Sequence, residues 1–312
     1  MNGKLLRVLG IAAVPAVLLL LVSFTWTLAD YAQATIAKVL IIGLLAVSVA
    51  LLTGTAGLPT LGQTAPYLVG AYTAANLVDF DMDIAVVQLL AAAGAGALFA
   101  LITAPIVVYA RGVVVLMITL ALGELTYTLA GQWKAITGGT DGKLAFARPY
   151  PVPGLAKLDS DADVYLYVLI VVAVLVGVVL LVLRSPAGAL LRATRDDDAR
   201  MRASGHPVAG YLTAAYVGAG ALAGAAGSLV VTVDQFVSPG TGGFEVSALI
   251  LLAVTIGGAT SMLGAVVGAA LVVLTRDWLG SYWPGNAPLL LGLLFILCVY
   301  LLPRGLLGRR NA

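Results

Sequence analysis

Long stretches without a charged residue set the tightest limit on how this chain can fold. One runs for about 40 residues from Val39 to Val78, and others cover 84–110, 164–183, 246–275 and 278–303. A helix needs roughly 20 apolar residues to cross the hydrocarbon core of a bilayer. Backbone groups in lipid must be hydrogen-bonded within the protein, and the alternation of a membrane β-barrel is missing here. The runs therefore predict helices, and the longest run must cross twice.

The composition agrees, because 61% of the 312 residues are hydrophobic and only 10% are charged. The surface of a soluble domain of this size would need more charge. We predict an all-α polytopic membrane protein, a single transmembrane domain over 1–312 with about 8–10 transmembrane helices, some of them broken or short. The N-terminal run is too long for the apolar part of a signal peptide, so we expect it to be a first span. The expected spans are 9–29, 36–53, 61–78, 84–109, 113–130, 164–183, 209–233, 246–258, 263–277 and 287–303.

The order of charges predicts an orientation. Eleven of the 17 Lys and Arg residues can be placed on one side with only three acids, and most Asp residues then fall on the other side. By the positive-inside rule the first side is cytoplasmic. Both termini and the 184–208 segment are then cytoplasmic, and the 131–163 loop is external. The loop is rich in Gly and Pro and predicts an irregular surface segment.

Two charge-free runs contain glycines at places that predict interrupted helices. The first is 52–72, with Gly57 and Gly62, and the second is 256–269. Interrupted helices in the two halves of a transporter point to its substrate path, although ordinary turns between full helices would leave the same pattern. The carboxylate of Glu124, which falls inside an expected span, could serve the path or be structural. The candidate path residues are Gly57, Gly62, Gln63, Thr64, Glu124, Gly257 and Gly258.

Motifs for chemistry are missing. The segment GGTDGK (138–143) lacks the spacing of a phosphate-binding loop, and DFDMD (79–83) lacks the later ligands of a calcium loop. A single histidine, His206, supports neither a zinc motif nor a Ser-His pair, and the single cysteine, Cys298, reads as a small buried side chain. We therefore expect no catalytic residues, no metal, no cofactor and no nucleic-acid partner, but contact with membrane lipid.

One hydrophilic segment interrupts the apolar sequence, LLRATRDDDARMRASGHPVAGY at 190–211. Ser185 and Pro186 predict the start of a short helix that ends near Thr194. A second helix of about eight residues would be capped by Asp196 and stopped by Gly205 with a positive φ. So short a helix is marginal alone in water, and a cytosolic partner protein could hold it. A solvated, basic loop on the cytoplasmic side is the alternative that these features leave open. The candidate contact residues are Leu190, Leu191, Arg192, Arg195, Asp196, Asp197, Asp198, Met201 and Gly205.

Several blocks, in order along about 40–308, resemble the M-type permease subunits of ABC importers for branched-chain amino acids. They are GTAGLPTLGQTAPYLVGAYTAA (54–75), ITLALGELTYTL (118–129) with ITGGTDG (136–142), the segment 185–229, FVSPGTGGFEVSALILLAVTIGGATSMLGAVVGAAL (236–271) and LLPRGLLG (301–308). The usual Ser-Leu-Gly-His of the first block is Thr60-Leu61-Gly62-Gln63 here, and the usual Arg-Glu-Asn-Glu is Arg195-Asp196-Asp197-Asp198.

The resemblance implies a multi-pass subunit of the bacterial inner membrane. It would pair with a second, related permease subunit and with two cytosolic ATPases, which hold ATP and Mg²⁺, and an external substrate-binding protein would dock on it. The 190–205 segment would be the coupling element, with Leu190, Leu191 and Met201 buried against an ATPase. The cargo would be branched-chain or related amino acids. Urea or short-amide import by the same kind of permease, and a secondary transporter or channel, remain alternatives.

Overall fold

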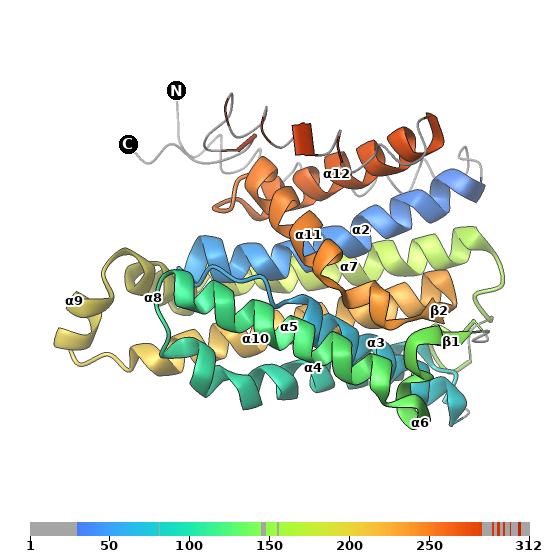
Figure 1. Ribbon diagram of the computed structural model, residues 1–312, viewed down its shortest axis with the longest axis horizontal. Coiled ribbons are helices and arrows are strands. Elements are labelled where there is room, and N and C mark those ends of the chain that lie inside the picture. Colours follow the sequence, from blue (N-terminus) through green and yellow to red (C-terminus); the bar gives the residue numbers. More distant parts are fainter. Residues whose placement is uncertain are drawn as a thin grey trace.

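The computed structural model describes residues 30–80, 82–144, 148–154 and 156–282, together with residues 289, 292, 293, 296, 300, 305 and 306. Within them the chain is a helical bundle (Figure 1). The expected spans 9–29 and 287–303, and both termini, lie outside the described residues or have only isolated residues described. The elements are α2 (Asp30–Ala50), η1 (Leu51–Ala56), α3 (Thr64–Asp79), α4 (Ala85–Val108), α5 (Val113–Gln132), α6 (Lys134–Thr137), η2 (Gly139–Asp141), β1 (Lys143–Leu144), α7 (Asp161–Arg184), α8 (Pro186–Asp196), α9 (Asp198–Ala203), α10 (Val208–Asp234), β2 (Phe236–Val237), η3 (Pro239–Gly242), α11 (Phe244–Gly257) and α12 (Met262–Tyr282).

The eight expected spans that fall in the described part of the chain each coincide with a helix, or for 36–53 with α2 and η1 together, and their ends differ by at most six residues. In the part of the chain that the structure describes, the segments long and apolar enough to cross a bilayer are 32–56, 85–108, 113–132, 161–184, 208–234 and 239–257. The fold is therefore that of a polytopic all-α membrane protein, as predicted. Helix α3, with 16 residues, and helix α11, with 14, are shorter, at about 24 and 21 Å. Neither alone spans a hydrocarbon core of about 30 Å.

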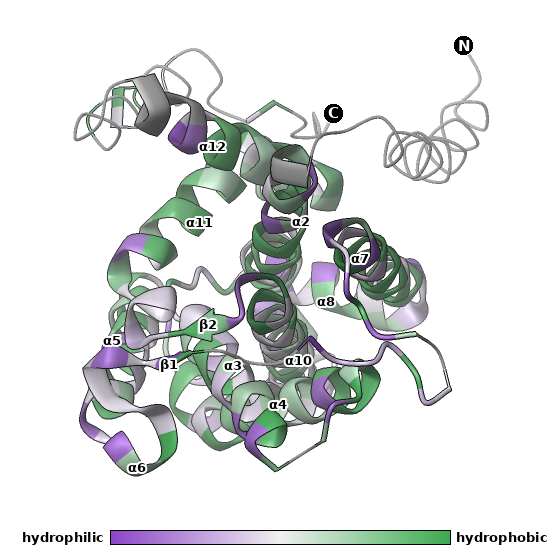
Figure 2. Cartoon of the chain, turned by 90° about the vertical axis from the view of Figure 1, so that its right-hand side faces the viewer, coloured by the Kyte–Doolittle hydropathy of each residue, from purple (hydrophilic) through white to green (hydrophobic). Residues whose placement is uncertain are grey.

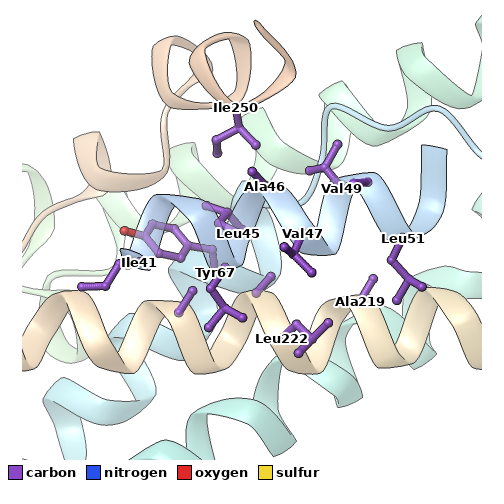
Figure 3. Packing of buried hydrophobic residues seen from close by; sticks show 14 of the residues in the cluster. Ile41, Leu45, Ala46, Val47, Val49, Leu51, Tyr67, Ala219, Leu222 and Ile250 are labelled. Atoms are coloured by element: carbon purple, nitrogen blue, oxygen red, sulfur yellow. The ribbon is translucent and has the colours of Figure 1, made fainter. Parts of the chain in front are cut away.

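The core of the bundle forms around α2 and α10. Seen along the helices, these two lie in the middle with the others around them (Figure 2). Both are largely buried inside the protein, whereas α4, α5 and α7 turn most of their apolar side chains outward. In the close view, Leu45 and Val47 of α2 pack towards Ala219 and Leu222 of α10, with Tyr67 of α3 beside them (Figure 3). Outer helices keep an apolar outward face because lipid, not water, surrounds them.

Small residues let α10 approach its neighbours closely. A Cβ on Gly224 would lie 2.3 Å from the carbonyl oxygen of Ala92 in α4, and one on Gly227 would lie 2.1 Å from that of Tyr67 in α3. Neither distance is compatible with a side chain. Close backbone contact is a main source of helix association in membranes, where lipid is as apolar as Leu. The Gly220-x-x-x-Gly224 pattern is thus a packing device in this chain.

The 131–163 loop differs from the irregular segment that we predicted. It contains α6, η2 and β1, and β1 pairs antiparallel with β2, Lys143 opposite Val237. Two-residue strands are too short to leave an alternating pattern in the sequence, so the prediction missed them. Lys143 also bonds Asp79 and Asn76 at the end of α3. This loop and the α8–α9 segment lie at opposite ends of the helices (Figure 1).

Candidate functional site

The first predicted interruption lies between α2 and α3. Helix α2 continues into η1, a π-helix, and ends at Gly57, whose φ of 75° a side chain rarely adopts. Residues 57–63 belong to no helix or strand, yet Leu58, Thr60 and Gln63 are buried. Irregular backbone is tolerated at membrane depth only where protein or a water-filled cavity surrounds it. The segment is therefore enclosed by neighbouring helices.

Helix α5 supplies the enclosing contact. Thr119 accepts a hydrogen bond from the Leu61 backbone N–H through its Oγ1 at 3.1 Å. A Cβ on Gly62 would lie only 2.4 Å from the Thr119 carbonyl oxygen, so the two backbones touch. Thr119 lies six residues into α5, about 9 Å from its start. The interruption therefore reaches into the bundle, and α3 begins there instead of at its end (Figure 1).

Helix α11 meets the start of α3. The hydroxyls of Thr64, the first residue of α3, and Ser247, the fourth of α11, are 2.7 Å apart and both are buried. Thr64 also faces Gly123 of α5, whose missing Cβ would lie 3.5 Å from its Oγ1. Helices α3, α5 and α11 thus converge at one polar point. Of the predicted path residues, Gly62, Gln63 and Thr64 lie here, and Ser247 and Thr119 join them.

Gln63 stands out at this point. It is the residue before α3 and only 2% exposed, yet it makes no capping bond, and among the described residues neither its Nε2 nor its Oε1 has a hydrogen-bond partner. An amide buried without a partner costs about 1–3 kcal/mol. Gln88, equally buried, donates from its Nε2 to the Met82 carbonyl at 2.8 Å. The uncompensated amide of Gln63 is therefore a particular feature of this point.

The second predicted interruption has another structure. Helix α11 ends at Gly257, a short turn follows at 258–261, and α12 begins at Met262. Gly258 has a φ of 98°, and Gly257 and Gly264 allow the two helices to cross closely. This is the ordinary turn that the sequence left open as an alternative. It lies beside η1, because a Cβ on Gly54 would lie 1.7 Å from the Ala259 carbonyl oxygen. Gly257 and Gly258 are therefore away from the point where α3, α5 and α11 meet.

Glu124 is half-buried on α5, eight residues before its end, about 12 Å. At 100° per residue it lies about 140° around the helix from Thr119, towards the side that carries the exposed Met117 and Leu125. In the described part of the chain no hydrogen bond or ion pair of its carboxylate is found. It is adjacent in sequence to Gly123 but does not share the face that meets Thr64.

Helix α8 begins as predicted, with Ser185 before it and Pro186 as its first residue, but ends at Asp196 instead of Thr194. Its inner side packs on the bundle through Gly188, Leu191 and Thr194, which are buried. The expectation that Leu191 would be buried against a partner is therefore wrong, because its own chain covers it. Met201 also packs partly against this core, and Leu190 is half-buried. The outward surface of the segment is charged instead.

Arg195 connects α8 to the first interruption. Its Nη1 donates to the Gly54 carbonyl oxygen in η1, and its side chain lies where a side chain on Gly57 would be. The sequence placed Arg195 towards a partner, whereas its guanidinium reaches the membrane part of its own chain. Arg192, three residues earlier, donates instead to the Leu183 carbonyl oxygen at 2.9 Å. No pattern in the sequence pairs residues so far apart.

Helix α9 is shorter than predicted, at six residues. Asp197, and not Asp196, caps it by accepting the Arg200 N–H at 2.9 Å. Gly205 has the predicted positive φ, at 81°, and the His206 N–H bonds the Met201 carbonyl, which closes the helix end. Asp198 bonds Arg202 and also Arg111, just before α5. The segment is thus tied to the bundle at both of its helices.

A family model described as the permease component of branched-chain amino acid transport systems matches residues 31–299. The chain belongs to this family. Two relatives are permease proteins LivM of high-affinity branched-chain amino acid transport systems. The one from Escherichia coli is 30% identical over 280 residues, and the one from Salmonella typhimurium is 31% identical over 281.

Each alignment covers 81% of this chain and 64% of the relative, so the chain spans less than two thirds of the length of these permease proteins. No solved structure matches it. Family membership and the apolar helices together establish a membrane protein of a permease family. In the described residues no group of His, Cys, Asp or Glu could hold a metal ion.

Proposed function

We propose that this chain is a permease subunit of an ATP-driven importer that moves branched-chain or related amino acids across the bacterial inner membrane. It pairs with a second permease subunit, two cytosolic ATPases hydrolyse ATP with Mg²⁺, and an external binding protein delivers the substrate. Both termini and the 184–208 segment face the cytoplasm, and the 131–163 loop faces outside. This chain performs transport and no catalysis of its own.

The observation that carries this proposal is the attachment of the α8–α9 segment. Its inner side is held by Leu191 and by the bond from Arg195 to Gly54, while Arg192, Asp196 and Arg200 are exposed. A force applied to the exposed surface reaches η1 and the interruption behind it. A loop that is only solvated needs no such attachment. The position of the segment, opposite the 131–163 loop, also suits a cytosolic ATPase at one end and a binding protein at the other (Figure 1).

The charged surface suits an ATPase groove with polar sides better than an apolar one. Asp196 at the end of α8 and Asp197, which caps α9, set the register with the partner, and Gly205 fixes the end of α9. Gly205→Val strains the positive φ by about 1–2 kcal/mol. We expect weaker ATPase association, or hydrolysis without uptake. Gly205→Asn is the matched control, because Asn tolerates this conformation better than a β-branched residue.

The experiment is reconstitution. The chain is expressed with the permease, ATPase and binding-protein subunits of its own source, purified as a complex and placed in vesicles. Uptake of L-[¹⁴C]leucine and substrate-stimulated ATP hydrolysis are measured together. Copurification with ATPases and ATP-dependent uptake support the proposal. Uptake driven by an ion gradient without ATPases would instead establish a secondary transporter, and uptake of urea but not leucine would establish a short-amide importer.

A further inference from the structure

We propose that Gln63, Thr64 and Ser247 form the intramembrane binding site for the charged head of an amino acid, held closed in this structure by the contact between α3 and α11. This inference rests on the proposed function and names the site and the substrate chemistry that it takes. It differs from the coupling segment in place and in the residues that carry it.

The first observation is the uncompensated amide. Gln63 is 2% exposed, and both polar atoms of its side chain lack a partner in the part of the chain that the structure describes. A buried polar group without a partner calls for an explanation such as an absent ligand. Gln63 adjoins Gly62 and Thr64, both of which contact α5, so its backbone is held firmly at the start of α3. A ligand that enters between α3, α5 and α11 would meet this amide.

The second observation is the arrangement of two short helices. Helix α3 begins inside the bundle. Near the start of α11, whose Phe244 and Glu245 are exposed, the buried Ser247 hydroxyl meets that of Thr64 at 2.7 Å. The N-terminus of a helix carries partial positive charge and favours an anion, and discontinuous helices with such ends bind anionic substrate groups in transporters. A carboxylate is therefore favoured at this point over a cation.

The chemistry of a zwitterion matches these groups. The amide of Gln63 offers a donor and an acceptor, so its Nε2 can donate to a carboxylate while its Oε1 accepts from an ammonium. The N-terminus of α3 adds attraction for the carboxylate. A neutral amide such as urea could satisfy Gln63 but would gain less from this helix end. The site thus prefers an amino acid to a short amide.

Closure follows from the Thr64–Ser247 contact. The hydroxyls bond each other, so one of the two O–H donors is used within the protein while α3 and α11 touch. Separation of the two helices exposes both hydroxyls and the Gln63 amide together. Substrate binding therefore requires α3 and α11 to separate. The moving segment directly follows η1, and Arg195 of α8 is hydrogen-bonded to η1.

The first test compares Gln63→Met with Gln88→Met in the reconstituted complex. Methionine keeps the approximate length and removes the amide. Because Gln63 has no partner in the closed state, its loss should leave thermal stability unchanged or raised, while KM for L-[¹⁴C]leucine rises at least about tenfold. Gln88→Met removes a bonded amide, so we expect lower stability and an unchanged KM.

The outcomes separate this inference from the proposed function. Leucine uptake by wild type with an unchanged KM in Gln63→Met overturns the site and leaves the proposed function standing. Wild-type uptake of [¹⁴C]urea in place of leucine overturns the zwitterion chemistry and the amino-acid cargo together. If the wild-type complex takes up neither probe, binding of L-[¹⁴C]leucine to the purified complex is measured, and no difference between wild type and Gln63→Met overturns the site.

The second test locks the contact. Thr64→Cys and Ser247→Cys are combined on a Cys298→Ala background, since the hydroxyls are close enough for their replacements to form a disulfide with little movement. We expect oxidation to abolish leucine uptake and a reductant to restore it, while each single variant is insensitive to oxidant. Full uptake by the cross-linked complex would show that α3 and α11 need not separate, which overturns the closure.

Discussion

The two glycine-rich interruptions look alike in sequence and differ in structure. Residues 57–63 follow a π-helix, enter the bundle and let α3 begin there, whereas residues 258–261 only turn the chain from α11 to α12. Both start at the same end of the bundle, because Gly54 touches the carbonyl group of Ala259. One interruption places a polar amide in the interior and the other is a connection.

The difference teaches that an interruption becomes a site through its partners. The first interruption, residues 57–63, contacts Thr119, whose hydroxyl accepts a hydrogen bond from the Leu61 N–H and whose carbonyl lies against Gly62. The backbone is thereby satisfied away from a helix, as membrane depth demands. At the second interruption the two flanking helices contact each other instead, because Gly257 and Gly264 let α11 and α12 cross closely. We expect changes at the first to affect transport and changes at the second to affect stability.

The largest effect is expected from Gly62→Leu. Any Cβ there meets the Thr119 backbone at 2.4 Å, so the interruption must move away from α5. We expect uptake to fall to background and stability to drop by about 1–3 kcal/mol through overpacking. Uptake and size-exclusion profiles of the complex are measured together. Gly94→Leu is the control, since nothing lies within 4 Å of a Cβ at that exposed position. Normal uptake with Gly62→Leu would remove the first interruption from the path.

The next effect is expected from Arg195→Met. The aliphatic part of the side chain is retained against Gly57, but the bond to the Gly54 carbonyl oxygen is lost. We expect ATP hydrolysis to continue while uptake per ATP falls about fivefold or more, because η1 no longer follows α8. Arg192→Met removes a bond within the start of the same segment and should keep normal coupling. Equal uptake per ATP in both variants would show that Arg195 does not carry the motion.

A smaller effect, of another kind, is expected from Gly258→Ala. The φ of 98° is unfavourable for an alanine, so the free energy of unfolding should fall by about 1–2 kcal/mol. Uptake per folded complex should remain normal, since this turn does not touch Gln63 or Thr64. Thermal unfolding in detergent and uptake at a permissive temperature are the measurements. A loss of uptake at unchanged stability would place Gly258 in the path beside the first interruption.

The smallest effect is expected from Glu124→Gln. Its carboxylate is turned well away from Thr119 around α5, so it does not share the face that meets Gln63 and Thr64. We expect KM and the maximal rate of leucine uptake to change by less than about twofold. Uptake kinetics of Glu124→Gln and of the unchanged protein, at matched expression, check this. A tenfold change would mean that the path also runs along the outer side of α5.

Much of the fold was predictable because membrane-spanning helices can be recognised in a sequence from their length and hydropathy. The α4, α5, α7 and α10 boundaries lie within three residues of those expected. The start of α8 was also predictable from Ser185 and Pro186, and the end of α9 from Gly205. The error of one residue in the α9 cap arose because Asp196, Asp197 and Asp198 are equivalent caps in sequence, and only the backbone chose Asp197.

The candidate site was predictable only in part. Gln63 and Thr64 were named because they follow a glycine-rich interruption, yet Ser247 and Thr119 carried no signal. They come from helices 183 and more than 50 residues away in sequence, and a hydroxyl within an apolar helix usually bonds its own backbone. Likewise, the sequence predicted that Arg195 contacts a partner, and only the tertiary structure brings its guanidinium to the Gly54 carbonyl oxygen.

The sequence by itself determined where helices form, which ends carry which charge, and where the chain must break, because each depends on residues near one another. Only the tertiary structure decided which interruption enters the bundle, which glutamine remains without a partner, and which face of α8 is covered by its own chain. Those outcomes depend on which helices come together. In a bilayer that choice is made by close backbone packing and by the need to satisfy every buried polar group, and neither is written in any short stretch of sequence.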